Sequence, residues 1–205
     1  MIKLAIIFLA MTSLAVLSCN SNSGSKEDKS EVKEETMPMN GNETADKDIK
    51  MLAATFTNVD AGVSAFMKAL VQDYLAVKNA LTNENEAAAA AASANIEKTI
   101  KAFDKSLLTA DQKKVYDDIE DDLKEHAEHV AMSKIDHQRE HFATMSKDVY
   151  DLVTAFGGGM VLYHDHCPMY DNNKGAMWLS ETKEITNPYF GEKMMTCGVV
   201  KEMIH

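Results

Sequence analysis

Thiol, thioether and imidazole side chains gather between residues 163 and 198. This stretch holds both cysteines that lie beyond residue 19, and it holds the single tryptophan, Trp178. Cu(I) prefers thiolate and thioether ligands, and imidazole also suits Zn(II). These residue types therefore predict the binding of a soft metal, copper before zinc. The candidate ligands are Cys167, Met169, Met194, Cys197, His164 and His166.

The two cysteines of this stretch allow a second interpretation. In an oxidising compartment Cys167 and Cys197 can pair as a disulfide instead of binding metal as thiolates. Such a bond closes a loop of about 30 residues and contributes on the order of 3 to 4 kcal/mol to stability. Spacing in the sequence does not choose between the two interpretations, and the methionines and histidines can bind metal in either case.

A second group of histidines lies upstream, in two pairs. His126 and His129 are three residues apart and His137 and His141 are four apart, so each pair shares one helix face. If the chain turns near Ser133, the pairs face each other on adjacent antiparallel helices and can bind Zn(II) or Cu(II). These four residues are secondary metal-ligand candidates. The alternative is that His126 is a hydrogen-bonded core residue and the other three are solvated.

A thiol enzyme is the least favoured class. Cys167 lies beside His164 and His166, but residues this close along a chain rarely adopt the geometry of a thiol–imidazole pair. The sequence shows no oxyanion-hole motif, no phosphate-binding loop and no HExxH or CxxC motif. We therefore expect a protein that is not an enzyme.

Amphipathic helices are predicted to position these side chains. Apolar residues recur at intervals of three and four, and cap and turn residues separate the helical stretches. Thr109 to Gln112 has the pattern of a capping box, and Gly157-Gly158-Gly159 is a strong stop signal. The predicted helical stretches are residues 59–81, 87–103, 115–130 and 135–156.

Four such helices with short connections close best as an antiparallel bundle. We expect residues 56–205 to form one all-α domain, an antiparallel four-helix bundle with an irregular C-terminal segment packed on it. The Trp178 side chain is expected to enter the core and so to attach that segment to the bundle.

The first 55 residues have the pattern of an export signal and a tether. Lys3 precedes an apolar run, residues 4–17, that is too short to span a membrane comfortably, so residues 1–18 are a predicted signal peptide. Cys19 follows a small residue, and this end resembles the lipobox of bacterial lipoproteins, which implies acylation of Cys19. Residues 19–55 are then the lipidated cysteine and a disordered tether. The expected location is the bacterial cell envelope, lipid-anchored, facing the periplasm or at the surface.

The charge of the chain argues against one class of partner. The formal net charge is −11 at pH 7, and Arg139 is the single arginine. Neutralising nucleic-acid phosphates needs clustered Lys and Arg, so no nucleic-acid partner is expected. An acidic surface raises the local concentration of cations, although it also simply keeps a protein soluble.

The second half of the chain resembles a bacterial domain family of unassigned function. The residues that carry the resemblance are Gln138-Arg139, Phe142, Cys167-Pro168-Met169, Gly175, Trp178-Leu179, Ile185, Asn187-Pro188-Tyr189-Phe190-Gly191, Met194 and Cys197-Gly198. That domain occurs alone in envelope lipoproteins, and it occurs at the C-terminal end of periplasmic adaptor subunits of copper and silver efflux pumps. Over about residues 60–204 the resemblance implies a helical domain linked to heavy-metal handling, with Cys167, Met169, Met194 and Cys197 as its ligands.

These patterns together predict an envelope metal-binding lipoprotein. It would bind copper, as Cu(I), or a similar soft metal, and act as a chaperone, a buffer or an efflux accessory. Its expected partners are the lipid bilayer, through Cys19, and an efflux adaptor or a metallochaperone. The alternative is a metal-free interaction module that docks on an efflux adaptor or another envelope protein. In that alternative Cys167 and Cys197 form a structural disulfide.

Overall fold

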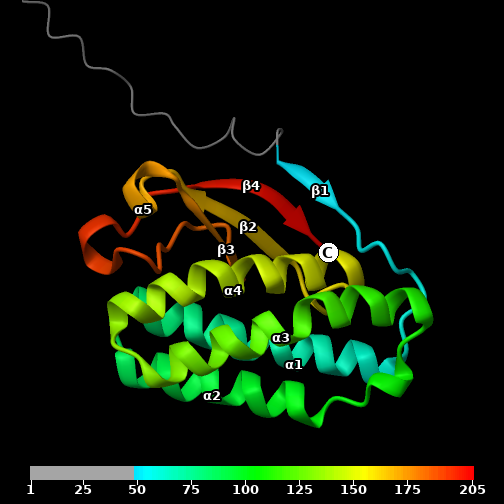
Figure 1. The fold of residues 1–205 in the computed structure, drawn as a ribbon. Coiled ribbons are helices and arrows are strands. Elements are labelled where there is room, and N and C mark those ends of the chain that lie inside the picture. The colour runs from blue at the N-terminus through cyan, green and yellow to red at the C-terminus, as the bar shows by residue number, and fades with distance from the viewer. Residues whose placement is uncertain (1–48) are drawn as a thin grey trace, which may run out of the picture. The chain divides into compact units, whose positions relative to one another are not determined.

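Four long helices and a four-stranded sheet make up the described part of the chain (Figure 1). The structure is a computed structural model, and it describes residues 49–205. The predicted signal peptide, Cys19 and most of the predicted tether lie outside these residues. No helix within residues 49–205 is both long and apolar enough to cross a membrane. The helices are α1 (Ala61–Thr82), α2 (Glu86–Ala102), α3 (Ala110–Met132) and α4 (Ile135–Phe156).

The helices form where the apolar periodicity predicts them. Each helix contacts the next one along the chain, and α4 also contacts α1. The ring of Tyr74 on α1 stacks on that of Phe142 on α4, with centroids 5.2 Å apart. The alanine-rich α2 approaches α3 closely enough for the buried Ser93 hydroxyl to donate a 2.8 Å hydrogen bond to the Ala127 carbonyl. The prediction of four helices is therefore confirmed.

The C-terminal segment is not irregular, and the prediction of an all-α fold was wrong on this point. It contributes β2 (Leu162–Cys167), β3 (Ala176–Ser180) and β4 (Val199–Ile204) to one sheet, in the order β1-β4-β2-β3. Strand β2 is antiparallel to both β3 and β4. The short β1 (Lys50–Leu52), from the end of the predicted tether, runs parallel to β4. The fold is mostly helical with a sheet in its C-terminal part.

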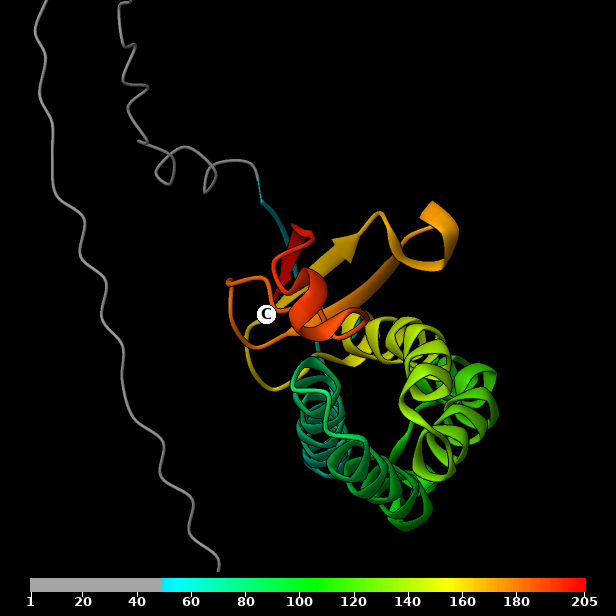
Figure 2. The same cartoon turned by 90° about the vertical axis from the view of Figure 1, so that its left-hand side faces the viewer.

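One face of the sheet covers α4 and α1 (Figure 2). Trp178 on β3 is fully buried there, as predicted. The Leu179 backbone N–H on the same strand donates a 3.0 Å hydrogen bond to the Tyr74 hydroxyl, which also lies 2.8 Å from the Ser146 hydroxyl on α4. A buried polar network therefore joins β3 to both helices, and burying a polar group costs little when it is hydrogen-bonded.

Three short helical turns complete the described chain. They are η1 (Lys105–Leu107), α5 (Tyr170–Asn173) and η2 (Gly191–Met194). The turn between β2 and β3 contains α5 and ends at Gly175, whose φ of +82° favours glycine. A Cβ at Gly175 would lie 2.6 Å from His166 Nε2, so this turn needs a residue without a side chain.

The capping box predicted at Thr109 is present and gives a test of the fold. The Gln112 N–H donates to the Thr109 hydroxyl (3.4 Å), and the Thr109 N–H donates to the Gln112 side chain (3.0 Å). We expect Thr109→Ala to lower the free energy of unfolding by about 1 kcal/mol, because the Gln112 N–H at the start of α3 loses its hydroxyl acceptor. Urea unfolding measures this, with Thr57→Ala at an exposed site as the control. Equal effects of the two substitutions would contradict the capping role.

Candidate metal centre

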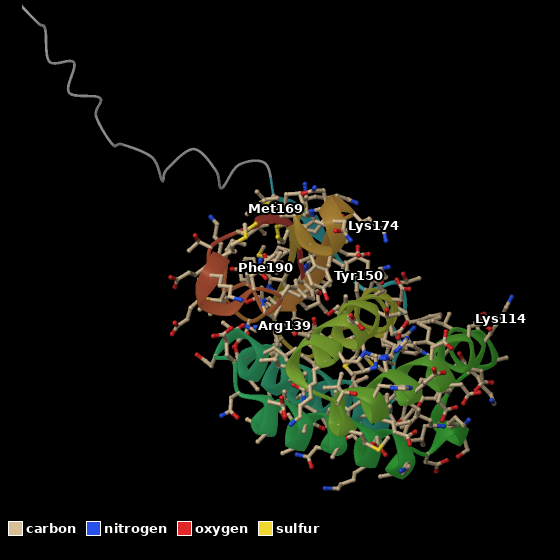
Figure 3. All side chains as sticks on the ribbon, turned by 60° about the vertical axis from the view of Figure 1, so that its left-hand side comes forward. Lys114, Arg139, Tyr150, Met169, Lys174 and Phe190 are labelled. Atoms are coloured by element: carbon tan, nitrogen blue, oxygen red, sulfur yellow. The ribbon has the colours of Figure 1, made fainter. Side chains whose placement is uncertain are left out.

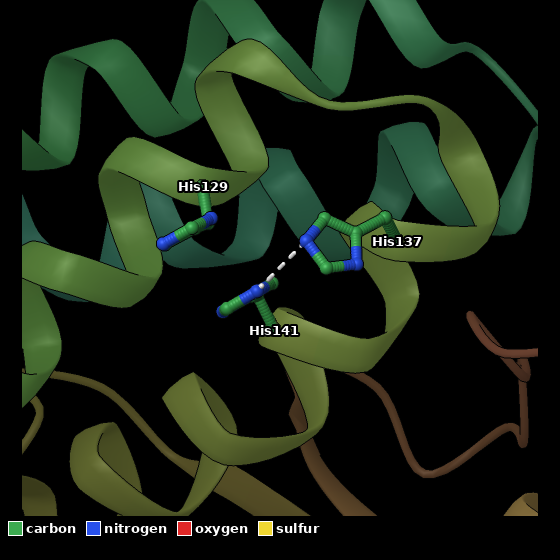
Figure 4. Close-up of side chains that lie close together, drawn as sticks. All are labelled: His129, His137 and His141. Atoms are coloured by element: carbon green, nitrogen blue, oxygen red, sulfur yellow. Dashed lines mark hydrogen bonds between the residues drawn. The ribbon is translucent and has the colours of Figure 1, made fainter.

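Four histidines meet at the turn between α3 and α4. Helix α3 ends at Met132 and α4 begins at Ile135, so the chain turns at Ser133, as predicted. His126 and His129 come from the last two turns of α3. His137 and His141 come from the first two turns of α4. The two helices therefore bring both pairs together, and Figure 4 shows three of the four rings.

His129, His137 and His141 have the spacing of ligands to one ion. One ring nitrogen of each lies within 4.8 Å of those of the other two. His137 Nε2 is 3.1 Å from His141 Nε2 (Figure 4), and the His129 ring stacks on the His141 ring with centroids 4.1 Å apart. Two nitrogens that bind one tetrahedral zinc at 2.0–2.1 Å lie about 3.3 Å apart. The three imidazoles can therefore reach a common ion with small movements.

The outer nitrogens of two of these rings already have partners. His137 Nδ1 lies 2.8 Å from the Glu140 carboxylate, and His141 Nδ1 lies 3.0 Å from His126 Nδ1. Metal-binding histidines usually bond through their second nitrogen to a carboxylate, a carbonyl or another acceptor, which fixes the ring and its tautomer. Glu140 and His126 occupy this outer position. The arrangement makes His126 an outer partner of His141 and leaves three imidazoles facing one another.

The hydrogen-bond network assigns the protons of the metal-free cluster. If His137 Nδ1–H donates to Glu140, then His137 Nε2 accepts from His141 Nε2–H, and His141 Nδ1 accepts from His126. Binding an ion at His141 Nε2 needs the other tautomer of His141, with its proton on Nδ1. His141 Nδ1–H can then donate a hydrogen bond to His126 Nδ1, provided that His126 carries its own proton on Nε2. The cluster can therefore rearrange for an ion without ionising any ring.

Burial favours the neutral forms of His141 and His126. Burial lowers the pKa of His141, and the neighbouring imidazoles of His129, His137 and His126 lower it further. Burial is also the main cause of the lowered pKa of His126. Only the neutral imidazole has a lone pair for a metal ion. The His137 side chain is 49% exposed, so the cluster opens to solvent on that side.

Glu140 is the functional candidate whose role the sequence did not reveal. The sequence alone assigned no role to this residue. The spacing His137-x-x-Glu140-His141 was the available signal, because residues three and four apart share a helix face. One class of zinc peptidases uses the same HxxEH spacing. Here the Glu140 carboxylate bonds to the outer nitrogen of His137, which fits an outer partner and not a base beside a metal-bound water.

The structure also brings the two C-terminal cysteines together. Cys167 Sγ, buried at the end of β2, lies 2.9 Å from Cys197 Sγ, which is half-buried in the loop before β4. Both are free thiols. Two thiolates on one tetrahedral zinc lie about 3.8 Å apart, so this pair is closer than a shared ion would hold it. The hydrogen bond to Cys167 is the main cause that raises the pKa of the Cys197 thiol to about 11.

The two predicted C-terminal histidine ligands do not join the cysteines. His164 Nδ1 lies 3.2 Å from the Glu202 carboxylate. His166 follows on β2 and points to the face opposite Cys167, since neighbouring strand residues alternate. Within residues 49–205, no three of Cys167, Cys197, His164 and His166 have ligand atoms within 4.8 Å of one another.

The two predicted methionine ligands lie at the surface of the same segment. Met169, just after β2, is 49% exposed, and Met194 at the end of η2 is half-buried. Figure 3 shows Met169 and Phe190 on the same side of the molecule. Both line a cavity of about 750 Å³ between α4 and the β2–β3 turn, and Glu140 lines it too. The motif residues of this segment therefore build a surface next to the histidine cluster.

Comparison with known proteins identifies one domain. Residues 70–160 match the model of a family described as a protein of unknown function (DUF3347). No curated protein and no solved structure matches the chain. The matched span starts within α1 and ends just after α4. It therefore contains both histidine pairs and Glu140, and it leaves out the two cysteines.

Proposed function

We propose that this protein binds a metal ion of the Cu(II) or Zn(II) class at His129, His137 and His141. The observation that carries the proposal is the convergence of three imidazole nitrogens within 4.8 Å, with Glu140 and His126 bonded behind two of the rings. Imidazole suits both metals, and Cu(II) binds most tightly among the common divalent ions. The proposal moves the main site from the C-terminal sulfur ligands to the α3–α4 turn.

The site is exposed, which favours a role in which the bound metal ion is taken up and released. Structural zinc sites are closed by four protein ligands, whereas sites with three protein ligands keep a position for water or an incoming ligand. His137 faces solvent and the chain is strongly acidic, which raises the local concentration of cations. A buffer, a chaperone or an efflux accessory needs such an accessible ion, so we propose this role.

The location and the partners follow from the sequence patterns. The predicted signal peptide and acylated Cys19 support a lipid-anchored envelope protein. The resemblance in the C-terminal motifs supports an efflux adaptor or a metallochaperone as the protein partner. We also propose that the four helices form an antiparallel bundle, since each packs on the next and α4 returns to α1.

A second candidate function is a metal-free interaction module. The 2.9 Å separation of the Cys167 and Cys197 sulfurs favours it, because the pair can then act as a staple for the motif segment. The exposed Met169 beside Phe190 supplies a docking surface for an envelope protein. Binding of Cu(I) by Cys167, Cys197, Met169 and Met194 stays a prediction, and it requires the two sulfurs to move apart.

Metal titration separates these functions. The protein is titrated with Zn(II) and Cu(II) against a competing chelator, and with Cu(I) under reducing conditions. A His129→Ala, His137→Ala, His141→Ala variant should lose divalent binding, whereas a Cys167→Ser, Cys197→Ser variant should keep it. Cu(I) binding that vanishes only in the cysteine variant would make the C-terminal sulfur ligands the preferred metal site. If the wild-type protein competes with the chelator for none of the three ions, the metal-free interaction module is the remaining candidate function.

The outer carboxylate gives a more specific prediction. We expect Glu140→Gln to weaken Zn(II) binding by about 10- to 100-fold, because a neutral amide replaces the charged carboxylate that orients the His137 ring and increases its basicity. Competition titration at pH 7.5 measures the change. The matched control is Glu192→Gln, an exposed glutamate on η2 that should bind as the wild type does. Equal affinities of Glu140→Gln and wild type would show that the Glu140–His137 contact does not serve a metal.

A further inference from the structure

The cysteine pair is placed by the backbone of the sheet. His166 on β2 is paired with Val199 on β4, so the residues just beyond this pair, Cys167 and Cys197, come from strand ends that are already held side by side. The buried Asn187 side chain donates a 2.8 Å hydrogen bond to the Cys197 carbonyl, which fixes the loop that carries this thiol. The pairing of β2 with β4 and the hydrogen bond from Asn187 therefore place the two sulfurs 2.9 Å apart.

The two sulfurs differ in access. Cys167 has no exposed surface, whereas Cys197 is half-buried. A reagent in solution therefore reaches Cys197 first and reaches Cys167 only through it. A pair with one accessible thiol and one hidden thiol within bonding reach is the arrangement that thiol–disulfide exchange uses.

We propose that Cys167 and Cys197 form a reversible disulfide, and that Cys197 is the sulfur through which a disulfide-bearing partner oxidises the pair. The Cys197 thiolate attacks one sulfur of the partner's disulfide, and the partner's S–S bond breaks to release one thiolate. The Cys167 thiolate then attacks Cys197 Sγ, and the mixed disulfide breaks to release the second thiolate. The protein pair loses two electrons, the partner gains them, and the two protein protons end on the two released thiols.

Oxidation would act on the surface that the motif residues build. The disulfide closes the chain between residues 167 and 197, and this loop carries Met169, Tyr170 and Phe190 in the wall of the 750 Å³ cavity. Closing the loop restricts the conformations that its residues can adopt when the segment opens. The redox state of the cysteine pair therefore controls the conformational freedom of the residues that line this side of the cavity. The histidine cluster takes no part in this step, so the inference does not depend on metal binding.

The test uses the full chain equilibrated with mixtures of reduced and oxidised glutathione. Free thiols are trapped by alkylation, and peptide mass spectrometry then reports Cys167 and Cys197 separately, so the state of Cys19 does not interfere. We expect both cysteines to be alkylated in reduced glutathione and linked to each other in oxidised glutathione. The oxidised protein should melt about 5–10 °C higher than the reduced protein.

Two single variants test the order of the steps. In Cys167→Ala, Cys197 should end as a mixed disulfide with glutathione, and it should alkylate at pH 8 about tenfold faster than in the reduced wild type. Alkylation is faster because Cys197 loses the hydrogen bond that raises its pKa, so more of it is thiolate. The lower nucleophilicity of a thiolate with a lower pKa offsets part of this increase in rate. In Cys197→Ala, Cys167 should stay unmodified until the protein is unfolded.

Three results would overturn the proposal. The wild type could carry two free thiols at every glutathione ratio, or it could carry two separate mixed disulfides. Alternatively, Cys167 in folded Cys197→Ala could alkylate as fast as Cys197 in Cys167→Ala. The wild-type measurement needs no variant, so it decides the disulfide even if a substitution prevents folding.

Discussion

Replacing His141 with alanine is expected to weaken Zn(II) and Cu(II) binding by more than about 100-fold, since removing only an outer partner of a metal ligand costs 10- to 100-fold. His141 is central to the cluster: its Nε2 faces His137, its Nδ1 faces His126, and its ring stacks on His129. The substitution therefore removes one ligand and also releases the other rings. Competition titration against a chelator at pH 7.5 measures the loss.

The control for this substitution is another histidine of the same chain. His166 is half-buried on β2 and belongs to no cluster of three metal ligands among residues 49–205. We expect His166→Ala to bind Zn(II) and Cu(II) as the wild type does. If His166→Ala lost binding and His141→Ala kept it, the site would lie in the C-terminal segment, as the sequence first indicated. Circular dichroism of both variants checks that the helices are intact.

Replacing Asp165 with asparagine is expected to stabilise the protein at alkaline pH. Asp165 on β2 is fully buried, and neither of its carboxylate oxygens has a hydrogen-bond partner of ordinary geometry. Burial raises its pKa to about 8, although the Lys78 ammonium and the Trp178 indole favour the charged form to a smaller extent. The unfolded carboxyl titrates near its ordinary pKa of 3.8. Folding therefore takes up a proton between pH 4 and 8, and stability falls as pH rises through this range.

Asparagine keeps the shape of the neutral carboxyl and cannot ionise. We expect Asp165→Asn to match the wild type near pH 4 and to exceed its free energy of unfolding by on the order of 2 to 4 kcal/mol at pH 8. Urea unfolding at a series of pH values measures both curves. Asp121→Asn, at a carboxylate that is 96% exposed, is the control and should follow the wild type. A less stable Asp165→Asn at pH 8 would mean that Lys78 holds Asp165 in its charged form.

The helices were predictable and the sheet was not, for a physical reason. The apolar stripes of α1 and α3 repeat over about six turns, and the caps of these helices are local. Strand β2 instead reads Tyr163-His164-Asp165-His166, with little apolar alternation. His164 pairs with Glu202 and Asp165 with Val200, so β4 carries one extra residue at this point. An extra residue of this kind breaks the two-residue period that would identify β4 as a strand. The pairing of β1 with β4 joins residues about 150 positions apart, which no local pattern encodes.

The candidate site was predictable in its ligands and not in its surroundings. Helical spacing and the turn at Ser133 were enough to place the histidine pairs opposite each other. The roles of Glu140 and His126 depend on which ring nitrogen faces which neighbour, and only the packed helices fix that. The density of soft ligands in residues 163–198 did not show which of them lie together, because strand alternation separates neighbours along the chain.

The short strand β1 has a practical consequence for shortened forms of the protein. Its three residues cover one edge of the six-residue strand β4, and the His205 N–H also donates to the Leu52 carbonyl. A fragment that starts after Leu52 would leave the backbone N–H and C=O groups along that edge of β4 without partners. Unprotected edges of this kind pair with other chains and promote aggregation. A fragment of residues 53–205 should therefore self-associate through β4, and one that begins before Lys50 should stay dispersed.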